Sequence, residues 1–235
     1  MFKSLQPSYT AVIIGASSGI GRAVFDAIKV DPHCEKIFGL SRSSTPAIDY
    51  DTPQSLEEAA TQISTEISSI DLLIIATGAL TAPNGTPPEK SVSQLTVEAM
   101  EEIFRINTIG PAIALRAFTP LLARDRRTLT ATLSARVGSI GDNALGGWFS
   151  YRASKAALNQ ITHSAAIEQS RRNDQSVCVA LHPGTIETGL SKPYARNRFT
   201  HSAEACASNL IQVLDTRTPE HSGGFFDYAG KEICW

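Results

Sequence analysis

A tyrosine and a lysine four positions apart, Tyr151 and Lys155, are the residues of this sequence best suited to acid–base chemistry. In a helix, that spacing puts the phenol and the ammonium group on one face. A nearby cation stabilises the phenolate and lowers the pKa of the tyrosine, which makes it a usable proton donor and acceptor near neutral pH. A Tyr-x-x-x-Lys pair also arises by chance as an ordinary surface pair, so its meaning depends on the motifs around it.

A glycine-rich turn lies near the start of the chain, between an apolar run and a helical stretch. Glycines permit positive φ and let the backbone approach a pyrophosphate closely, while a helix N-terminus supplies N–H donors and a positive dipole. The spacing departs from the usual Gly-x-Gly-x-x-Gly, and a purely structural turn is the alternative. We expect the phosphate-binding residues to be Gly15, Ser17, Ser18, Gly19, Ile20 and Gly21.

The residue type at the end of the next strand indicates which dinucleotide binds. An NAD site wants an acidic residue about 20 positions after the glycine turn, where it holds the ribose hydroxyls. Counting from Gly21 reaches Ser41-Arg42-Ser43, with no carboxylate. An arginine between two hydroxyls suits a 2′-phosphate, so Arg42 predicts NADP(H) as the cofactor; the alternative is a surface charge.

Apolar runs of strand length alternate with longer helical stretches along the whole chain. We expect strands at residues 10–14, 36–41, 71–76, 128–134, 177–182 and 224–228, and helices at 19–29, 55–68, 97–123, 151–172 and 202–214. The strand runs are almost continuously apolar, as in a parallel sheet covered on both faces. The prediction is an α/β chain: one doubly wound, Rossmann-type domain over residues 1–235, with a mainly parallel sheet flanked by helices. In such a sheet, ligands bind beyond the carboxyl ends of the strands.

The composition argues against several classes of protein. The net charge of −2 and the pI near 6.2 give no overall positive potential that would attract nucleic acid. No apolar run reaches the ~18 residues of a membrane span. The basic cluster Arg124, Arg126 and Arg127 is expected to be solvated surface. The four cysteines and five histidines show no metal-ligand spacing, so we expect free thiols and no metal. Because the N-terminus also shows no apolar signal region, we expect a cytoplasmic protein. His182 is expected to be a packed, hydrogen-bonded residue.

Together these motifs resemble the short-chain dehydrogenase/reductase family over essentially the full length of the chain. The matching pieces are the glycine turn, Asp49, Asn107, Tyr151 with Lys155, and Pro183-Gly184; the segment from Val137 to Lys155 is most similar to the carbonyl-reductase-like branch, which contains the bacterial C-factor. The resemblance implies that Tyr151 exchanges a proton with the substrate oxygen. It also implies that Lys155 holds the nicotinamide ribose and lowers the pKa of Tyr151, and that Asn107 kinks its helix and supports a proton relay through water.

The same resemblance implies further cofactor contacts and an assembly. Asp49 would meet the adenine, Gly78 would contact the cofactor through its backbone, and the segment from Pro183 through Gly184 and Ile186 to Thr188 would lie along the nicotinamide. Ile186 would meet the carboxamide. The helices expected at 97–123 and 151–172 would form a homodimer or homotetramer.

Two positions depart from the family pattern. Where relatives carry Asn-Asn-Ala-Gly, this chain reads Ile75-Ala76-Thr77-Gly78, which keeps the glycine and loses the asparagines. The usual catalytic serine falls at Ala135, so a hydroxyl that orients the carbonyl would come from Ser134 or Ser139. Adjacency favours Ser134, and a loop turning back could instead present Ser139.

The leading hypothesis is hydride transfer between NADP(H) and a small-molecule carbonyl or alcohol. An alternative of another class is a dinucleotide-binding, C-factor-like signalling or sensor protein with little catalysis, which Ala135 and the lost asparagines favour. A nucleotide-sugar epimerase shares the Tyr-x-x-x-Lys pair but usually brings a longer C-terminal region. Trp148 and Phe149 would line the substrate pocket or pack in the core.

Overall fold

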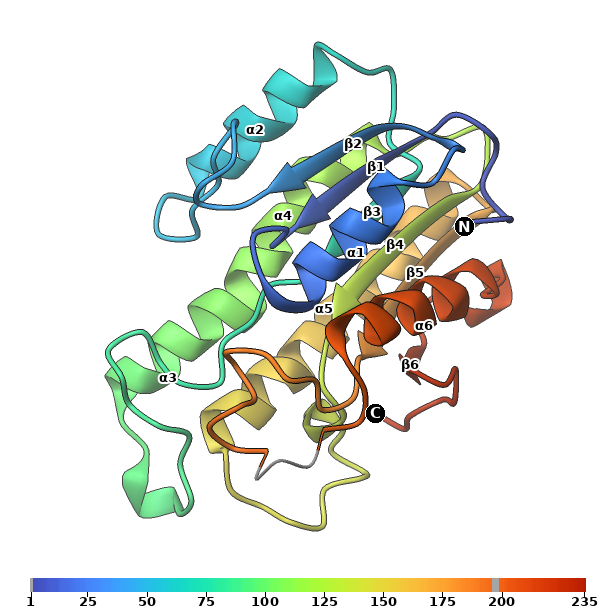
Figure 1. Ribbon diagram of the computed structural model, residues 1–235. Coiled ribbons are helices and arrows are strands. Elements are labelled where there is room, and N and C mark those ends of the chain that lie inside the picture. Colours follow the sequence, from blue (N-terminus) through green and yellow to red (C-terminus); the bar gives the residue numbers. More distant parts are fainter. Residues whose placement is uncertain (1, 196–198) are drawn as a thin grey trace.

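The computed structural model describes residues 2–195 and 199–235, in which six parallel strands form one sheet (Figure 1). The strand order is β2-β1-β3-β4-β5-β6. The strands are β1 (Tyr9–Ile14), β2 (Cys34–Leu40), β3 (Leu72–Ile75), β4 (Thr128–Leu133), β5 (Ser176–His182) and β6 (Phe225–Asp227). The predicted fold class, a doubly wound parallel sheet flanked by helices, is confirmed.

Helices cover both faces of the sheet because alternate strand residues point to opposite sides and both sets are apolar. Ala11 and Ile13 of β1 pack with α1 (Gly19–Lys29) and α6 (Ala203–Asp215). Val12 and Ile14 face α2 (Gln54–Ser64), α4 (Gly110–Phe118) and α5 (Phe149–Arg172). Short 3-10 segments occupy Val92–Gln94, Thr119–Leu121, Arg136–Gly138 and Pro219–His221.

The helix expected at residues 97–123 is interrupted. It consists of α3 (Val97–Phe104), a π-helical turn at Arg105–Ile109, and α4, followed by the 3-10 turn. The π turn is centred on Asn107, so the predicted kink is present. Helix α2 ends at Ser64 rather than at 68, where the serine-rich segment before β3 begins.

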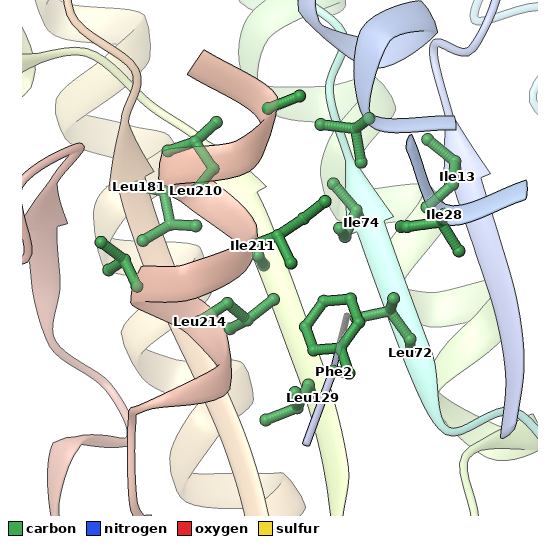
Figure 2. Packing of buried hydrophobic residues seen from close by; sticks show 14 of the residues in the cluster. Phe2, Ile13, Ile28, Leu72, Ile74, Leu129, Leu181, Leu210, Ile211 and Leu214 are labelled. Atoms are coloured by element: carbon green, nitrogen blue, oxygen red, sulfur yellow. The ribbon is translucent and has the colours of Figure 1, made fainter. Parts of the chain in front are cut away.

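The N-terminal segment is anchored in the core rather than loose. The ring of Phe2 lies among Leu72 of β3, Ile211 and Leu214 of α6 (Figure 2). Burying an aromatic side chain stabilises the fold by roughly 1.5–3 kcal/mol, so these first residues contribute to the α1/α6 layer.

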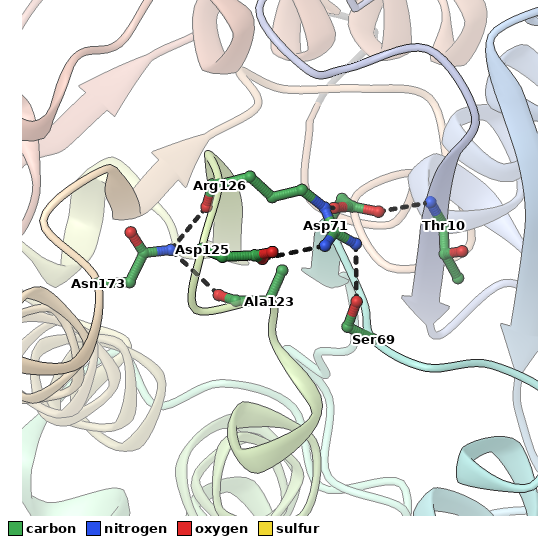
Figure 3. Close-up of polar contacts among 7 residues, drawn as sticks. All are labelled: Thr10, Ser69, Asp71, Ala123, Asp125, Arg126 and Asn173. Carbon is green, nitrogen blue, oxygen red and sulfur yellow. Dashed lines mark hydrogen bonds and ion pairs between the residues drawn. The ribbon is translucent and has the colours of Figure 1, made fainter.

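The basic cluster near residue 125 is only partly surface. Arg126 Nε donates to Asp71 Oδ1 at 2.6 Å, and Arg126 Nη2 donates to Ser69 Oγ at 2.7 Å (Figure 3). Arg127 donates to the carbonyl of Arg217 and is half-buried, whereas Arg124 is exposed. The expectation of solvated arginines is therefore wrong for two of the three, because they enter β4 beside the buried Asp71 at the start of β3.

The sheet has its topological switch point between β1 and β3. From β1 the chain moves to β2 on one side and later returns to β3 on the other. The loops after β1 and β3 therefore diverge above the carboxyl ends of these strands, and a ligand can enter the crevice between them. The glycine turn at 15–21 and Gly78 flank this crevice.

Candidate active site

Two adjoining cavities open beyond the carboxyl ends of the strands. The inner one is about 480 Å³ and brings together predicted residues from distant parts of the chain: Ser18, Gly19, Ile20, Gly78, Ser134, Tyr151, Lys155, Pro183, Gly184, Ile186 and Thr188. The outer one is about 430 Å³ and is walled mainly by apolar residues and two arginines. Gly15, Ser17, Gly21, Arg42, Asp49, Asn107 and Ser139 are not among the lining residues of either cavity.

The glycine turn has the geometry that a pyrophosphate needs. Gly15 has a φ of +89°, and a Cβ on Gly21 would lie 2.2 Å from the Gly15 oxygen, so neither position accepts a side chain. Ser18 is the N-cap of α1 but makes no side-chain cap, and the first turn carries no acidic residue. The N–H groups at this helix end therefore remain available to an anion.

Tyr151 lies in the first turn of α5 and is only 8% exposed. Trp148, the N-cap residue with a φ of 52°, packs its ring edge-on against Tyr151, with 6.2 Å between the centroids. Burial raises the pKa of the phenol well above its ordinary value. The expected lowering of the Tyr151 pKa is thus wrong for this structure, because desolvation dominates.

Lys155 lies one helical turn after Tyr151, and its burial explains why its charge does not lower the pKa of the phenol. Its ammonium nitrogen donates to the Leu133 carbonyl at 2.8 Å, and the side chain is 3% exposed. Burial lowers the pKa of Lys155 to about 7, so the group is only partly cationic at neutral pH. A Cβ on Gly78 would lie 3.3 Å from Nζ, so the glycine kept from the family pattern leaves room above the amine.

Asn107 is fully buried and joins three parts of the site. Its Oδ1 accepts from the Ala79 N–H at 2.7 Å, and its Nδ2 donates to the Ala79 carbonyl at 2.8 Å and to Ser154 Oγ at 3.1 Å. The π turn therefore tethers the loop after β3 to the helix that carries Tyr151.

The two candidate serines are placed differently. Ser134 borders the inner cavity, but its hydroxyl donates to Asn159 Oδ1 at 2.5 Å. Ser139 is 1% exposed, accepts from the Asp142 N–H at 3.0 Å, and lies 3.5 Å from Cys234 Sγ. Ser134 is thus the closer of the two to the site, yet its hydroxyl already donates its hydrogen bond to Asn159.

Arg42 and Asp49 lie on the loop that follows β2. Arg42 is exposed two residues past the strand, and the Gly15 N–H donates to the Leu40 carbonyl at 2.8 Å, so the glycine turn and the Arg42 loop start side by side. Asp49 Oδ1 accepts from the Asp51 N–H at 3.0 Å, which stabilises the same loop. Both residues lie near the β2 edge of the crevice.

A hydroxyl pair supports the turn that lacks the family asparagines. Thr77 Oγ1 and Tyr50 Oη are 2.8 Å apart, and Tyr50 packs over Gly110, where a Cβ would collide with its ring. The support for this turn therefore comes from a residue 27 positions earlier. No local pattern in the sequence indicates that pairing.

The segment after β5 forms the floor of the inner cavity. Gly184 has a φ of +85°, Ile186 is buried, and the Thr188 N–H donates to Ser191 Oγ at 3.3 Å. Pro183 and Thr188, which are expected along the nicotinamide, line the same cavity. Residues 196–198 of the following loop lie outside the described part of the chain.

The outer cavity is lined by Trp148, one of the two expected pocket residues, and by arginines that the sequence did not reveal. Phe149, the other expected pocket residue, is not among its lining residues. Arg152 donates to the Gly146 and Gly147 carbonyls at 3.2 and 2.9 Å, and burial lowers its pKa. Arg136 pairs with Asp227 at 3.2 Å. These arginines hold the loop between β4 and α5 over the cavity.

His182 borders both cavities and is not hydrogen-bonded as expected. Its Nδ1 is buried and has no hydrogen-bond partner among the described residues. The expectation of a hydrogen-bonded histidine is wrong for this ring nitrogen, and among the described residues the neighbouring His201 Nε2 is likewise buried without a partner.

Metal ligands, membrane-spanning helices and disulfides can be judged for the described part of the chain alone. It contains no cluster of three or more histidine, cysteine, aspartate or glutamate side chains able to hold a metal ion. None of its helices combines the length and apolar character needed to cross a bilayer. The four cysteines are free thiols, as expected.

Comparison with known proteins gives clear matches. The family model for short chain dehydrogenases matches residues 41–198. C-signal of Myxococcus xanthus is 38% identical over 136 residues, 58% of this chain and 78% of that protein. A 1-hydroxy-2-glutathionyl-2-methyl-3-butene dehydrogenase of Rhodococcus sp. (strain AD45) is 29% identical over 237 residues, 96% and 99% of the two chains. The NADPH-bound carbonyl reductase from chicken fatty liver has a TM-score of 0.83 at 23% identity, covering 99% of this chain and 96% of that chain.

Proposed function

Because this chain belongs to the short-chain dehydrogenase family, we propose that it interconverts a carbonyl and an alcohol by hydride transfer with NADP(H), Tyr151 being the acid/base. The predicted family resemblance is confirmed, and the chain is an oxidoreductase of that family. The observation that carries the finer proposal is the inner cavity, where Tyr151 and Lys155 face the open end of α1.

The residues that line the inner cavity, together with the glycine turn and the loop after β2 beside it, fit a phosphorylated dinucleotide. The uncapped N-terminus of α1 and the glycines at 15, 19 and 21 would hold the pyrophosphate, and Arg42 would hold the 2′-phosphate. Asp49 would meet the adenine, Lys155 the ribose, and Ile186 the carboxamide. When bound, the cofactor supplies or accepts the hydride. The structurally similar chicken carbonyl reductase binds NADPH, which supports this choice.

Tyr151 is suited to the acid role in carbonyl reduction. The phenol is protonated at neutral pH, as an ordinary tyrosine is, and burial raises its pKa further; it can give its proton to the oxygen as negative charge develops there. Lys155, within one helical turn, would stabilise the resulting phenolate. Asn107 would maintain the loop above the site and support proton return through water.

The experiment is Tyr151→Phe, measured with NADPH and 4-nitrobenzaldehyde. We expect kcat to fall by roughly 10²–10⁴-fold, because general acid catalysis is lost, while the Kd for NADPH stays within about two-fold. Tyr228→Phe, which removes a hydroxyl outside both cavities, is the matched control. Unchanged turnover in Tyr151→Phe would refute the mechanism.

A second function has a specific observation in its favour. The similarity to C-signal and the alanine at position 135 favour a dinucleotide-binding signalling or sensor protein with little catalysis. NADPH oxidation against a panel of aldehydes, ketones and quinones separates the two. Tight NADPH binding with no turnover of any panel member would favour the sensor.

We also propose that the chain forms a homodimer or homotetramer and works in the cytoplasm. Helices α4 and α5 border a surface groove of about 530 Å³, and the nearby Ile109 and Ile167 are 52% and 45% exposed. An apolar helical face of this kind supports self-association. Four unpaired cysteines support a reducing compartment.

A further inference from the structure

The boundary between the inner and outer cavities is where the reacting carbonyl would sit, if the proposed function is right. The residues that line both cavities are Leu80, Ala135, Tyr151, His182, Gly184, Leu190 and Ser191. Only Tyr151, His182 and Ser191 carry polar side chains. Among the described residues that line both cavities, these three are the side chains able to hydrogen-bond a substrate oxygen at this boundary.

Ser191 is already committed to its own loop. Its hydroxyl donates to the Ile186 carbonyl and accepts from the Thr188 N–H at 3.3 Å. Ser134, just inside the inner cavity, donates to Asn159. Ala135 has no hydroxyl, so the proton donor that a serine there would offer is missing.

His182 is the polar side chain that remains. It ends β5, directly after Leu181, which pairs in register with Leu133 of β4, and the Ser134 N–H donates to the Leu181 carbonyl at 2.8 Å. The strand ends therefore place His182 beside the Ser134–Ala135 segment. Because Nδ1 is enclosed, Nε2 is the ring nitrogen that can reach a molecule in the cavities.

The imidazole is neutral under ordinary conditions. Burial, together with the neighbouring Arg136 and His201, lowers the pKa of His182 to about 4, although Asp227 and Asp142 oppose the shift. A neutral imidazole carries one N–H, so it can donate a single hydrogen bond without changing charge.

We propose that His182 donates a hydrogen bond to the carbonyl oxygen of the substrate, in the place of the serine hydroxyl that Ala135 lacks. When bound, NADPH would supply the hydride and be left as NADP⁺; as the hydride adds to the carbonyl carbon, the C=O π electrons would move to oxygen. Tyr151 gives its phenolic proton to that oxygen, and His182 keeps its own proton throughout. His182 is thus a second catalytic residue beside Tyr151.

The kinetic test compares His182→Ala and His182→Gln with NADPH and 4-nitrobenzaldehyde. Removing one donor to a developing oxyanion lowers kcat by roughly 10²-fold, with the Kd for NADPH unchanged. Gln places an amide N–H near the Nε2 position and restores part of the loss. Ala135→Ser, added to His182→Ala, restores at least about ten-fold, because the serine then supplies the missing donor. His33→Ala, with a side chain 55% exposed and far from the cavities, is the control.

A spectroscopic test does not depend on turnover. In the Tyr151→Phe variant with NADP⁺, which cannot donate a hydride, the infrared carbonyl stretch of bound 4-nitrobenzaldehyde should move to higher frequency when His182→Ala is added. A His182→Ala kcat within three-fold of wild type, no rescue by Ala135→Ser, or an unmoved carbonyl band would each overturn the inference. If instead wild type fails to oxidise NADPH, or Tyr151→Phe leaves turnover intact, the proposed function itself fails.

Discussion

Glu89 should set the start of the helix that carries Tyr151. Its carboxylate is 4% exposed; Oε2 accepts from the Ser150 N–H at 3.2 Å and Oε1 accepts from the Ser150 hydroxyl. Its backbone carbonyl accepts from the Trp148 N–H. Trp148 occupies the N-cap of α5 but has no side-chain oxygen to cap with, so Glu89 performs that task from 61 residues away.

Glu89→Ala removes both a hydrogen-bond acceptor and a negative charge from the start of α5. Loss of an N-cap acceptor costs about 0.5–2 kcal/mol, and loss of a partly buried charge at a helix N-terminus costs up to about 2 kcal/mol. These effects overlap, so we expect the free energy of unfolding to fall by about 1–3 kcal/mol, which lowers Tm by roughly 2–12 °C in a chain of this size. Glu89→Gln keeps an acceptor and should lose about half as much.

The assay combines thermal unfolding with kcat measured well below Tm. A displacement of Tyr151 approaching ~1 Å lowers kcat by up to about 10²-fold, so Glu89→Ala should lose at least ten-fold while NADPH affinity changes little. Glu98→Ala removes an exposed acid from the first turn of α3 and is the matched control. If Glu89→Ala is no less stable than Glu98→Ala, the capping argument is wrong. If Tm falls but kcat does not, the helix start does not position Tyr151.

Three other changes test separate parts of the molecule. Arg42→Asp should raise the Kd for NADPH over that for NADH by roughly 10–100-fold, since a charged hydrogen bond is lost; equal losses by fluorescence titration would contradict it. The pKa of Lys155 is about 7 in the folded chain and ~10.4 in the unfolded chain, so the unfolded chain binds more protons between those pH values. The free energy of unfolding of wild type, measured in urea, should therefore rise by up to a few kcal/mol relative to Lys155→Met between about pH 6.5 and 9.5. Parallel pH dependences of the two proteins would refute this. Asp71→Ala, which strands the half-buried Arg126, should cost about 2–4 kcal/mol, against under ~1 for the exposed Asp125→Ala; similar Tm values would argue against the pairing.

The fold could be predicted because its signals are local. Runs such as 10–14 are apolar on both faces, and that alone distinguishes covered parallel strands from half-exposed ones. The glycine turn could also be predicted, since positive φ and close packing restrict a position to glycine regardless of the rest of the sequence. Helix limits were less accurate because the π turn at Asn107 depends on bonds to Ala79 and Ser154, distant in sequence.

The cavity walls could not be predicted, because they also depend on contacts between residues that are distant in sequence. Glu89 and Tyr50 act through partners that are distant in sequence, and His182 borders the two cavities where β5 ends; their own sequence neighbourhoods carry no sign of this. From sequence alone, Glu89 looks like a loop acid, Tyr50 like a core aromatic and His182 like a packed histidine. Long-range pairing, rather than residue type, decides what these side chains do.

The pKa of Tyr151 joins these observations to the direction of reaction. Two effects oppose each other: a nearby cation lowers the pKa of the phenol, and burial raises it. Burial also lowers the pKa of Lys155 to about 7, so the amine carries only part of its positive charge at neutral pH. The same burial raises the pKa of Tyr151. A phenol held protonated suits proton donation to a carbonyl and hinders proton removal from an alcohol. Alcohol oxidation requires the phenolate, so its rate should rise with pH, whereas carbonyl reduction uses the protonated phenol.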